Sequence, residues 1–133
     1  MKKAIYILMC TLGFFNAKSQ SISDLCQYKI RNFTTKDTKA HRQNWSIAQS
    51  PINNFIYIAN SAGLLEFDGS HWKLHKLKNK QNIRSVFINT KGKIFTGALG
   101  EFGYWNKNAT GELQYHSLRH LIKDQNYKNE EFW

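Results

Sequence analysis

The stretch GLLEFDGSHW, residues 63–72, decides the fold. It surrounds the dipeptide Asp68-Gly69 with leucine, phenylalanine and tryptophan. Asp-Gly between two short apolar runs is a strong β-hairpin signal, because glycine accepts the positive φ that tight hairpin turns require. We therefore predict two strands in this region, joined by a turn at Asp68-Gly69.

Similar β-rich runs fill the chain from Trp45 onward, separated by turn residues. This spacing is typical of all-β sandwiches, barrels and propellers. The 41% apolar and 14% aromatic content is enough for a packed core. The predicted strands lie within residues 44–49, 54–60, 63–69, 71–77, 84–89, 93–98, 101–106 and 111–118.

These runs form a repeat of four strands that occurs twice. The number of residues between matched positions of the two copies changes only where the turns lie. A period near 40 residues with four strands per unit indicates propeller blades, which are small sheets that cover one another. The matched residues are Ile47 with Val86 (offset 39), Ile56–Ala59 with Ile94–Gly97 and Leu64 and Phe67 with Phe102 and Trp105 (38), and Trp72, Leu74 and Leu77 with Leu113, Tyr115 and Leu118 (41).

We therefore expect an all-β chain with about two four-stranded blades of an incomplete β-propeller. The expected segments are a signal peptide at 1–19, a lead-in at 20–42 with a short strand near 28–33, blade 1 at 43–80, blade 2 at 81–120, and the start of a truncated third blade at 121–133. Since propellers have about 4–8 blades, we expect a longer parent chain. Residues 20–133 alone should aggregate or melt without cooperativity.

The N-terminus has the layout of a secretory signal peptide. Lys2 and Lys3 precede the apolar run Ala4–Phe15, and Ala17 and Ser19 are the small residues expected before a cleavage site. The apolar run is too short to cross a membrane as a mature helix. We therefore expect export to the periplasm.

Charge and cysteine content argue against two other classes of protein. The chain holds 19 Lys and Arg against 9 Asp and Glu, but they are spread out, so we interpret them as solvated surface and expect no nucleic-acid partner. Cys10 would leave with the leader, and Cys26 would remain as a free thiol or half of a disulfide. A disulfide scaffold is therefore not expected.

The two blade phrases resemble the start of the two-component-regulator propeller. This propeller is the extracytoplasmic sensor region of hybrid two-component and LuxR-like regulators of the Bacteroidetes. Residues 63–69 fit its phrase G-L-aromatic-x-F-D-G, although Leu65 stands where an aromatic is common. EFGYW, at 101–105, resembles the second blade of the subgroup whose propeller precedes a triple-tyrosine (Y_Y_Y) domain. The resemblance covers residues 43–118.

The resemblance implies periplasmic ligand sensing coupled to transcription, with polysaccharide breakdown products as a common ligand class. The implied partners are the remaining blades, the triple-tyrosine domain, a membrane helix, and a kinase or helix-turn-helix domain, all in the downstream chain. Membrane attachment would come only from those regions. Two alternatives stay open: the N-terminal part of a secreted propeller glycosidase or lyase, and a carbohydrate-binding adhesin.

We predict no enzymatic activity and no cofactor. Glu66, Asp68 and Glu101 could supply a catalytic acid pair, but Asp68 suits a turn, as does its counterpart Asn106. Glycines at 97, 100 and 103 are expected in a turn within a blade rather than at the start of a phosphate-binding helix.

We also predict no metal site. His71 and His75 are four residues apart, as are His116 and His120. On a strand this spacing separates the residues by about 13 Å, which is too far for one metal ion. We interpret His75 and His116 as equivalent surface residues of the outer strands.

The aromatic residues admit two interpretations. Alternation along a strand favours packing between blades, and the alternative is a platform on which sugar rings stack. The residues concerned are Phe67, Trp72, Phe102, Tyr104 and Trp105. Propeller ligands usually sit at the central channel, which points to the regions 42–45, 82–85, 61–63 and 99–101, although no single binding residue is assigned.

Overall fold

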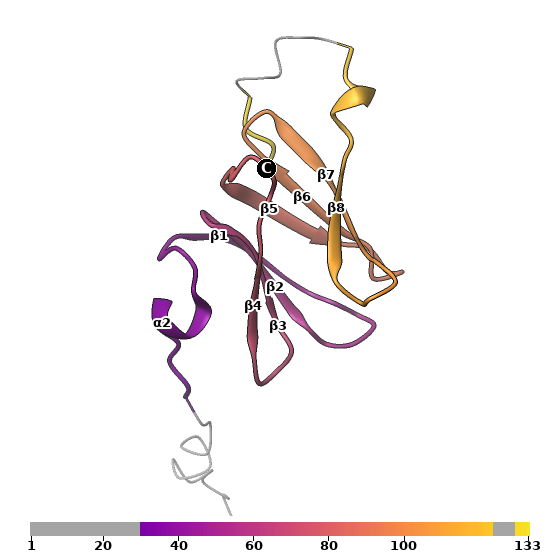
Figure 1. The fold of residues 1–133 in the computed structure, drawn as a ribbon. Helices are drawn as coiled ribbons and strands as arrows, with labels where there is room; N and C mark the ends of the chain where they lie inside the picture. The colour runs from indigo at the N-terminus through magenta and orange to yellow at the C-terminus, as the bar shows by residue number, and fades with distance from the viewer. Residues whose placement is uncertain (1–29, 124–129) are drawn as a thin grey trace, which may run out of the picture. The chain divides into compact units, whose positions relative to one another are not determined.

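The structure is a computed structural model that describes residues 30–123 and 130–133. The chain divides into two units, residues 1–32 and 33–133, and every helix and strand below belongs to the second (Figure 1). The predicted signal peptide lies outside the described residues, as does the greater part of the lead-in. Residues 30–33 form no strand.

The described part of the lead-in contains a short helix, α2 (Thr35–Thr38). Thr34 caps it, because its hydroxyl accepts from the Lys36 amide while Asp37 accepts from the Thr34 amide at 2.7 Å. Ser/Thr followed three residues later by an acid is a capping box. The strand expected near 28–33 is absent from its described part, residues 30–33, and the helix begins directly after it.

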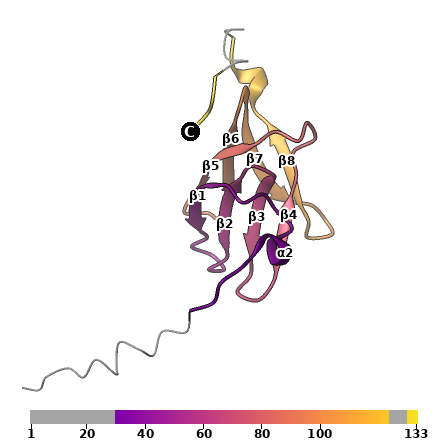
Figure 2. The same cartoon turned by 90° about the vertical axis from the view of Figure 1, so that its left-hand side faces the viewer.

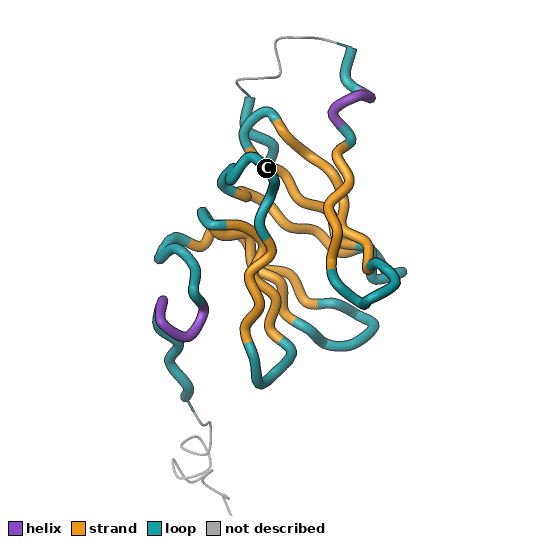
Figure 3. The backbone as a smooth tube through the Cα atoms, viewed as in Figure 1, coloured by secondary structure: helices purple, strands orange, loops and turns teal. Residues whose placement is uncertain are grey.

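Among the described residues, eight strands form two antiparallel four-stranded sheets, each in sequence order (Figures 1 and 3). Sheet A contains β1 (Asn44–Gln49), β2 (Ile56–Asn60), β3 (Gly63–Phe67) and β4 (Trp72–His75). Sheet B contains β5 (Ile83–Ile88), β6 (Ile94–Ala98), β7 (Glu101–Lys107) and β8 (Leu113–Ser117), and the short 3₁₀ helix η2 (Arg119–Leu121) follows it. The all-β prediction and all eight predicted strands are confirmed.

The two sheets repeat one another in their hydrogen-bonded register. Ile56 pairs with Phe67 in sheet A, and Ile94 pairs with Trp105 in sheet B. The first strand pair of each sheet also carries a register shift at the same place. The shift lies at Trp45, between Asn44 and Ser46, in β1, and at Arg84, between Ile83 and Ser85, in β5. We call Trp45 and Arg84 the bulge residues.

The fourth strands match at a different offset from the one predicted. Phe67 pairs with Trp72, and the corresponding pair in sheet B is Trp105 with Tyr115, so Trp72 matches Tyr115 rather than Leu113. The cause is the length of the connection: nine residues separate Trp105 from Tyr115 and four separate Phe67 from Trp72, which is five more rather than the predicted three. An even shift keeps each side chain on the same face, so the apolar pattern conceals it.

The main core lies between the sheets, where β5 packs against β1 and β2 (Figure 2). Each sheet contributes one face, as alternation along a strand requires. The Trp105 indole in this core donates to the Thr96 hydroxyl at 2.9 Å. The buried residues of the core are Tyr57, Ala59, Leu64, Leu77, Ile83, Val86, Ile94, Ala98 and Trp105.

Only one of the five aromatics assigned to packing between blades lies between these two sheets. That residue is Trp105. Phe67 and Trp72 stack together at 4.5 Å and meet Phe33 edge-on at 5.3 and 5.2 Å, outside this core. The other two, Phe102 and Tyr104, alternate with Trp105 along β7 and so lie on its opposite face.

Gly63 is the glycine whose replacement should cost most in sheet A. Its φ is +147°, and a Cβ atom there would lie 2.2 Å from the carbonyl oxygen of His75. We expect Gly63→Ala to destabilise the β3–β4 ladder by about 2–3 kcal/mol, measured as faster amide hydrogen exchange.

Gly111→Ala is the matched control, since Gly111 has φ +81° but open space around its Cβ position. This variant should carry backbone strain alone, about 1 kcal/mol. Equal acceleration of exchange by the two substitutions would contradict the close approach at Gly63.

Candidate functional site

The two bulge residues, which come from the first strands of the two sheets, β1 and β5, meet at one place. The Arg84 guanidinium carbon lies 4.0 Å from the centroid of the Trp45 ring, a cation–π distance. The Trp45 indole donates to the Ser61 hydroxyl at 2.9 Å. β-Bulges re-aim a side chain out of the strand's alternation and are enriched beside active sites. We therefore treat this place as the candidate site.

Two residues near the end of the described chain complete the site. Glu131 Oε1 accepts from Arg84 Nε at 2.9 Å and lies 2.8 Å from Nη2. The Trp133 ring lies 5.9 Å from the Trp45 ring, edge to face, and 5.9 Å from the Arg84 guanidinium. We call Trp45, Ser61, Arg84, Glu131 and Trp133 the inner-strand cluster.

The electrostatics of this cluster centre on Arg84, whose side chain is only 18% exposed. Its Nη1 atom is buried and has no hydrogen-bond partner among the described residues. A buried donor without a partner is costly, and such groups are enriched at functional sites. Guanidinium groups flanked by aromatic rings suit planar anions, and aromatic rings suit the apolar faces of sugars.

The regions expected to line a central channel do meet here. Residues 42–45, 61–63 and 82–85 supply Trp45, Ser61 and Arg84. The turn at 99–101 adjoins them, since the Gln81 side chain donates to the Leu99 carbonyl at 2.9 Å and Gly100 N–H donates to the Glu130 carbonyl at 2.8 Å. No local sequence pattern indicates that Glu131 and Trp133 belong to this site, because the acid that pairs with Arg84 lies 47 residues along the chain.

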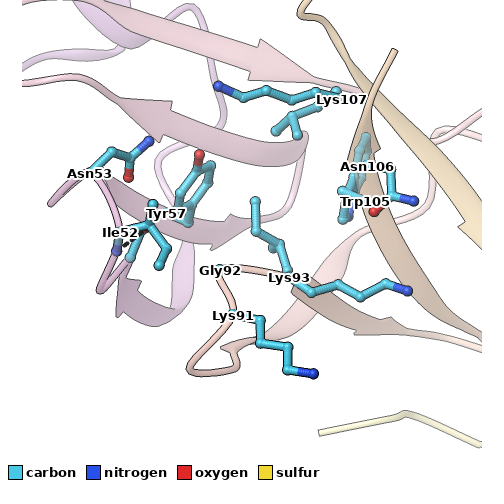
Figure 4. A pocket seen from close by; sticks show the side chains of 12 residues that line it. Ile52, Asn53, Tyr57, Lys91, Gly92, Lys93, Trp105, Asn106 and Lys107 are labelled. Atoms are coloured by element: carbon cyan, nitrogen blue, oxygen red, sulfur yellow. Dashed lines mark hydrogen bonds between the residues drawn. The ribbon is translucent and has the colours of Figure 1, made fainter.

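A cleft, which we call the basic cleft, lies beside the turns that follow β1 and β5, away from the inner-strand cluster (Figure 4). It has a volume of about 470 Å³, and Tyr57 and Trp105 are among its lining residues. Its three lysines point in different directions in Figure 4. Lys93 Nζ lies 3.6 Å from the Tyr104 ring centroid and Lys107 Nζ lies 5.9 Å from that of Phe55. The cleft therefore offers no converging cationic site.

Tyr57 forms part of this cleft and of the core, with 2% of its surface exposed. Burial, with a smaller contribution from the Glu66 charge, raises the pKa of Tyr57 to about 12. Burial and the Glu101 charge also raise the pKa of Tyr115. Both phenols therefore remain protonated at neutral pH, and neither is poised to act as a base.

Each of the three candidate acids has a structural role of its own. Glu66 contacts His75 at 2.7 Å. Glu101 accepts from the Tyr115 and Ser117 hydroxyls at 3.0 and 2.7 Å, with Arg119 at 3.8 Å. Asp68, as predicted, makes its turn.

The Asp68 turn explains the state of its carboxylate. Asp68 accepts from the amides of His71 and Ser70 at 2.6 and 2.7 Å, and these bonds lower the pKa of the carboxyl group. The prediction for its counterpart is wrong, because Asn106 lies in β7. Asn108 makes the corresponding turn instead, since its side chain accepts from the amides of Thr110 and Glu112.

Two further sequence assignments need correction. His75 is buried against Glu66, and His116 stacks on Tyr104 at 5.0 Å, so the two are not equivalent surface residues. The corrected match of β8 explains this difference. Tyr104 corresponds to Glu66, so its partner His116 corresponds to Lys73, the partner of Glu66, and not to His75. Gly97 and Gly103 lie inside β6 and β7, so only Gly100 occupies the predicted turn.

Within the described residues, no three His, Cys, Asp or Glu side chains gather as a metal site would require. No helix in that part of the chain has the length and apolarity to cross a membrane. Comparison with protein-family models, with curated proteins and with solved structures gives no match for this chain.

Removing the Arg84 charge should loosen the last described residues. We expect Arg84→Gln to lose both the Glu131 pair and the stack on Trp45, a cost of about 1–3 kcal/mol. Gly100 N–H, which donates to Glu130, and Phe132 N–H, which donates to Ala98, should then exchange about tenfold faster or more.

The matched control is Lys73→Gln, which breaks the ion pair with Glu112 at 3.5 Å, where both side chains are more than half exposed. Exposed pairs contribute about 0–1 kcal/mol, so exchange at Gly100 should not change. Unchanged exchange in Arg84→Gln as well would show that Arg84 does not hold this segment.

The raised pKa of Tyr57 predicts a loss of stability in alkali. Between pH 10 and about 12 the unfolded chain releases the phenolic proton while the folded chain retains it, so the free energy of unfolding falls as pH rises. Tyr57→Phe should weaken this dependence, as followed by near-ultraviolet circular dichroism. If the wild-type chain and Tyr57→Phe unfold at the same pH, ionisation of Tyr57 is not the cause of the loss of stability in alkali.

Proposed function

We propose that residues 43–120 form the first two blades of a β-propeller that senses a ligand without catalysing a reaction. The parent would be a membrane-bound signal-transduction or transcriptional regulator of the two-component or LuxR-like kind, with this segment in the periplasm. The observation that carries the proposal is the repeat of two four-stranded sheets, register for register, with a bulge at the same place in each innermost strand.

The stacking of the sheets supports the propeller. Each innermost strand, β1 and β5, is followed by its three neighbours in sequence order, and one sheet covers the other through β5. Blades of a propeller cover one another in this way. The blade phrase that resembles the two-component-regulator propeller includes the turn that Asp68 makes.

A glycan-derived ligand at the inner-strand cluster fits the chemistry there. Trp133 is 70% exposed and offers an aromatic ring, and the cation Arg84 lies 5.9 Å from that ring and 4.0 Å from the Trp45 ring. The acids Glu66, Asp68 and Glu101 are engaged in structural contacts, which supports recognition rather than hydrolysis.

The test uses the parent gene in its host, with Trp45→Ala on the chromosome. We expect transcription that responds to one class of oligosaccharide to be lost in the variant, because the ring that contacts Arg84 is gone. Trp72→Phe, a change outside the inner-strand cluster, is the control and should keep the response. Transcription that never responds to saccharides, or a purified protein that cleaves them, would contradict the proposal.

A further inference from the structure

Sheet B presents an uncovered face of aromatic rings, on the side away from sheet A. Phe87, Phe95, Tyr104 and His116 are direct cross-strand neighbours across all four strands. Their successive ring centroids lie 6.2, 6.3 and 5.0 Å apart. We call these four residues, together with Phe102, the aromatic face. Phe87 is 63% exposed.

The corresponding positions of sheet A are covered. Phe95 and Phe102 of sheet B match Tyr57 and Leu64, which are 2% and 0% exposed. Sheet B itself covers them, through the core that it shares with sheet A. The face that sheet B covers in sheet A is therefore left uncovered at the corresponding positions of sheet B.

Chain from beyond sheet B already occupies one end of the aromatic face. Glu131 pairs with Leu99 in an antiparallel bridge, and Phe132 N–H donates to the Ala98 carbonyl at 3.2 Å. The Phe132 ring lies 4.9 Å from that of Phe102, and the Ser85 hydroxyl donates to the Phe132 carbonyl. This segment contacts β5 and β6, the counterparts of the strands β1 and β2 on which β5 packs.

The close approach of Phe132 depends on Gly97. A Cβ atom at Gly97 would lie 2.3 Å from the Phe132 carbonyl oxygen. Beside this contact runs an apolar groove of about 220 Å³, with Phe87, Phe95 and Phe102 in its lining. The groove therefore continues from the seated segment toward the exposed end of the aromatic face.

We propose that the aromatic face is the docking surface for a further antiparallel four-stranded sheet of this same repeat, whose innermost strand runs on from the seat of Glu131–Trp133. The inference rests on the proposed propeller and adds the surface, the entry point and the chemistry of its partner. The partner face is apolar and closely fitted, as the face of sheet B that covers sheet A is.

Two other occupants fit the structure less well. A sugar would stack on open ring faces, but Lys93 Nζ already lies 3.6 Å above Tyr104. A second copy that continued the stack would have to offer the outer face of sheet A, where Phe33 already packs against Phe67 and Trp72. A second copy that offered its own aromatic face would not run on from the seated segment. A new sheet that continues from the seated segment meets neither obstacle.

The test extends the full chain with a second copy of residues 85–123, placed so that Trp133 takes the position of Arg84. The control extension has the same residues in scrambled order. In a background of Cys10→Ser and Cys26→Ser, Phe87→Cys reports on the aromatic face and Ala59→Cys on the core between sheets A and B, since Ala59 is 0% exposed. The measurement is the rate of thiol labelling at low protein concentration.

We expect the repeat extension, but not the scrambled one, to slow labelling of Phe87→Cys by more than about 30-fold, because a covered thiol reacts only through local opening. Equal labelling with both extensions, while Ala59→Cys stays protected, would overturn the docking surface and leave the two-sheet stack intact. Rapid labelling of Ala59→Cys would overturn the stack and with it the proposed propeller.

The same reporter identifies the alternative occupants. Slower labelling of Phe87→Cys in the unextended chain at rising protein concentration would assign the aromatic face to a second copy. Slower labelling on addition of cellohexaose would assign it to a sugar. Either result, without an effect of the repeat extension, overturns the proposal.

Discussion

The structure depends on the burial of one face of sheet A by one face of sheet B. Tyr57 and Leu64 on one side and Ile94 and Trp105 on the other exclude water from a single shared core. A four-stranded sheet has two faces and cannot cover either alone, so each sheet requires a neighbour. Sheet B meets this requirement for one face of sheet A.

The bulges give two side chains a direction that an ordinary strand does not allow. In an ordinary strand, Trp45 and Arg84 would alternate with their neighbours and point to one face of their sheets. The register shifts at both positions release them from that alternation, and the two side chains meet at the inner edge of the stack. The bulge position of each sheet therefore carries a side chain, Trp45 or Arg84, that is not among the buried residues of the apolar core between the sheets.

The sequence predicted the strands well because the signals were local. Turn residues such as Asp68 and Gly69 bound each run, and alternation within a run defines its faces. The inner-strand cluster was predicted only as four regions, since a bulge changes one hydrogen-bond pair and leaves no pattern in the residues. The pairing of Arg84 with Glu131 joins residues 47 positions apart, which no local signal encodes.

The misplaced match of β8 has an equally physical cause. A shift of two residues keeps every side chain on its own face, so apolar patterning cannot detect it. His75 was consequently matched to His116 and expected at the surface, whereas it packs against Glu66 in the interior. The helix α2 was missed although Thr34 and Asp37 form a recognisable capping box.

The stacking of the two sheets is the central claim, and one contact across it is open to direct measurement. The His75 ring of sheet A lies 6.0 Å, between centroids, from the Trp105 ring of sheet B. Nuclear Overhauser effects between the aromatic protons of these two residues in solution are the predicted result. If the cross-strand effects within each sheet were present and those between His75 and Trp105 absent, the sheets would form without the shared core, and the account would be wrong.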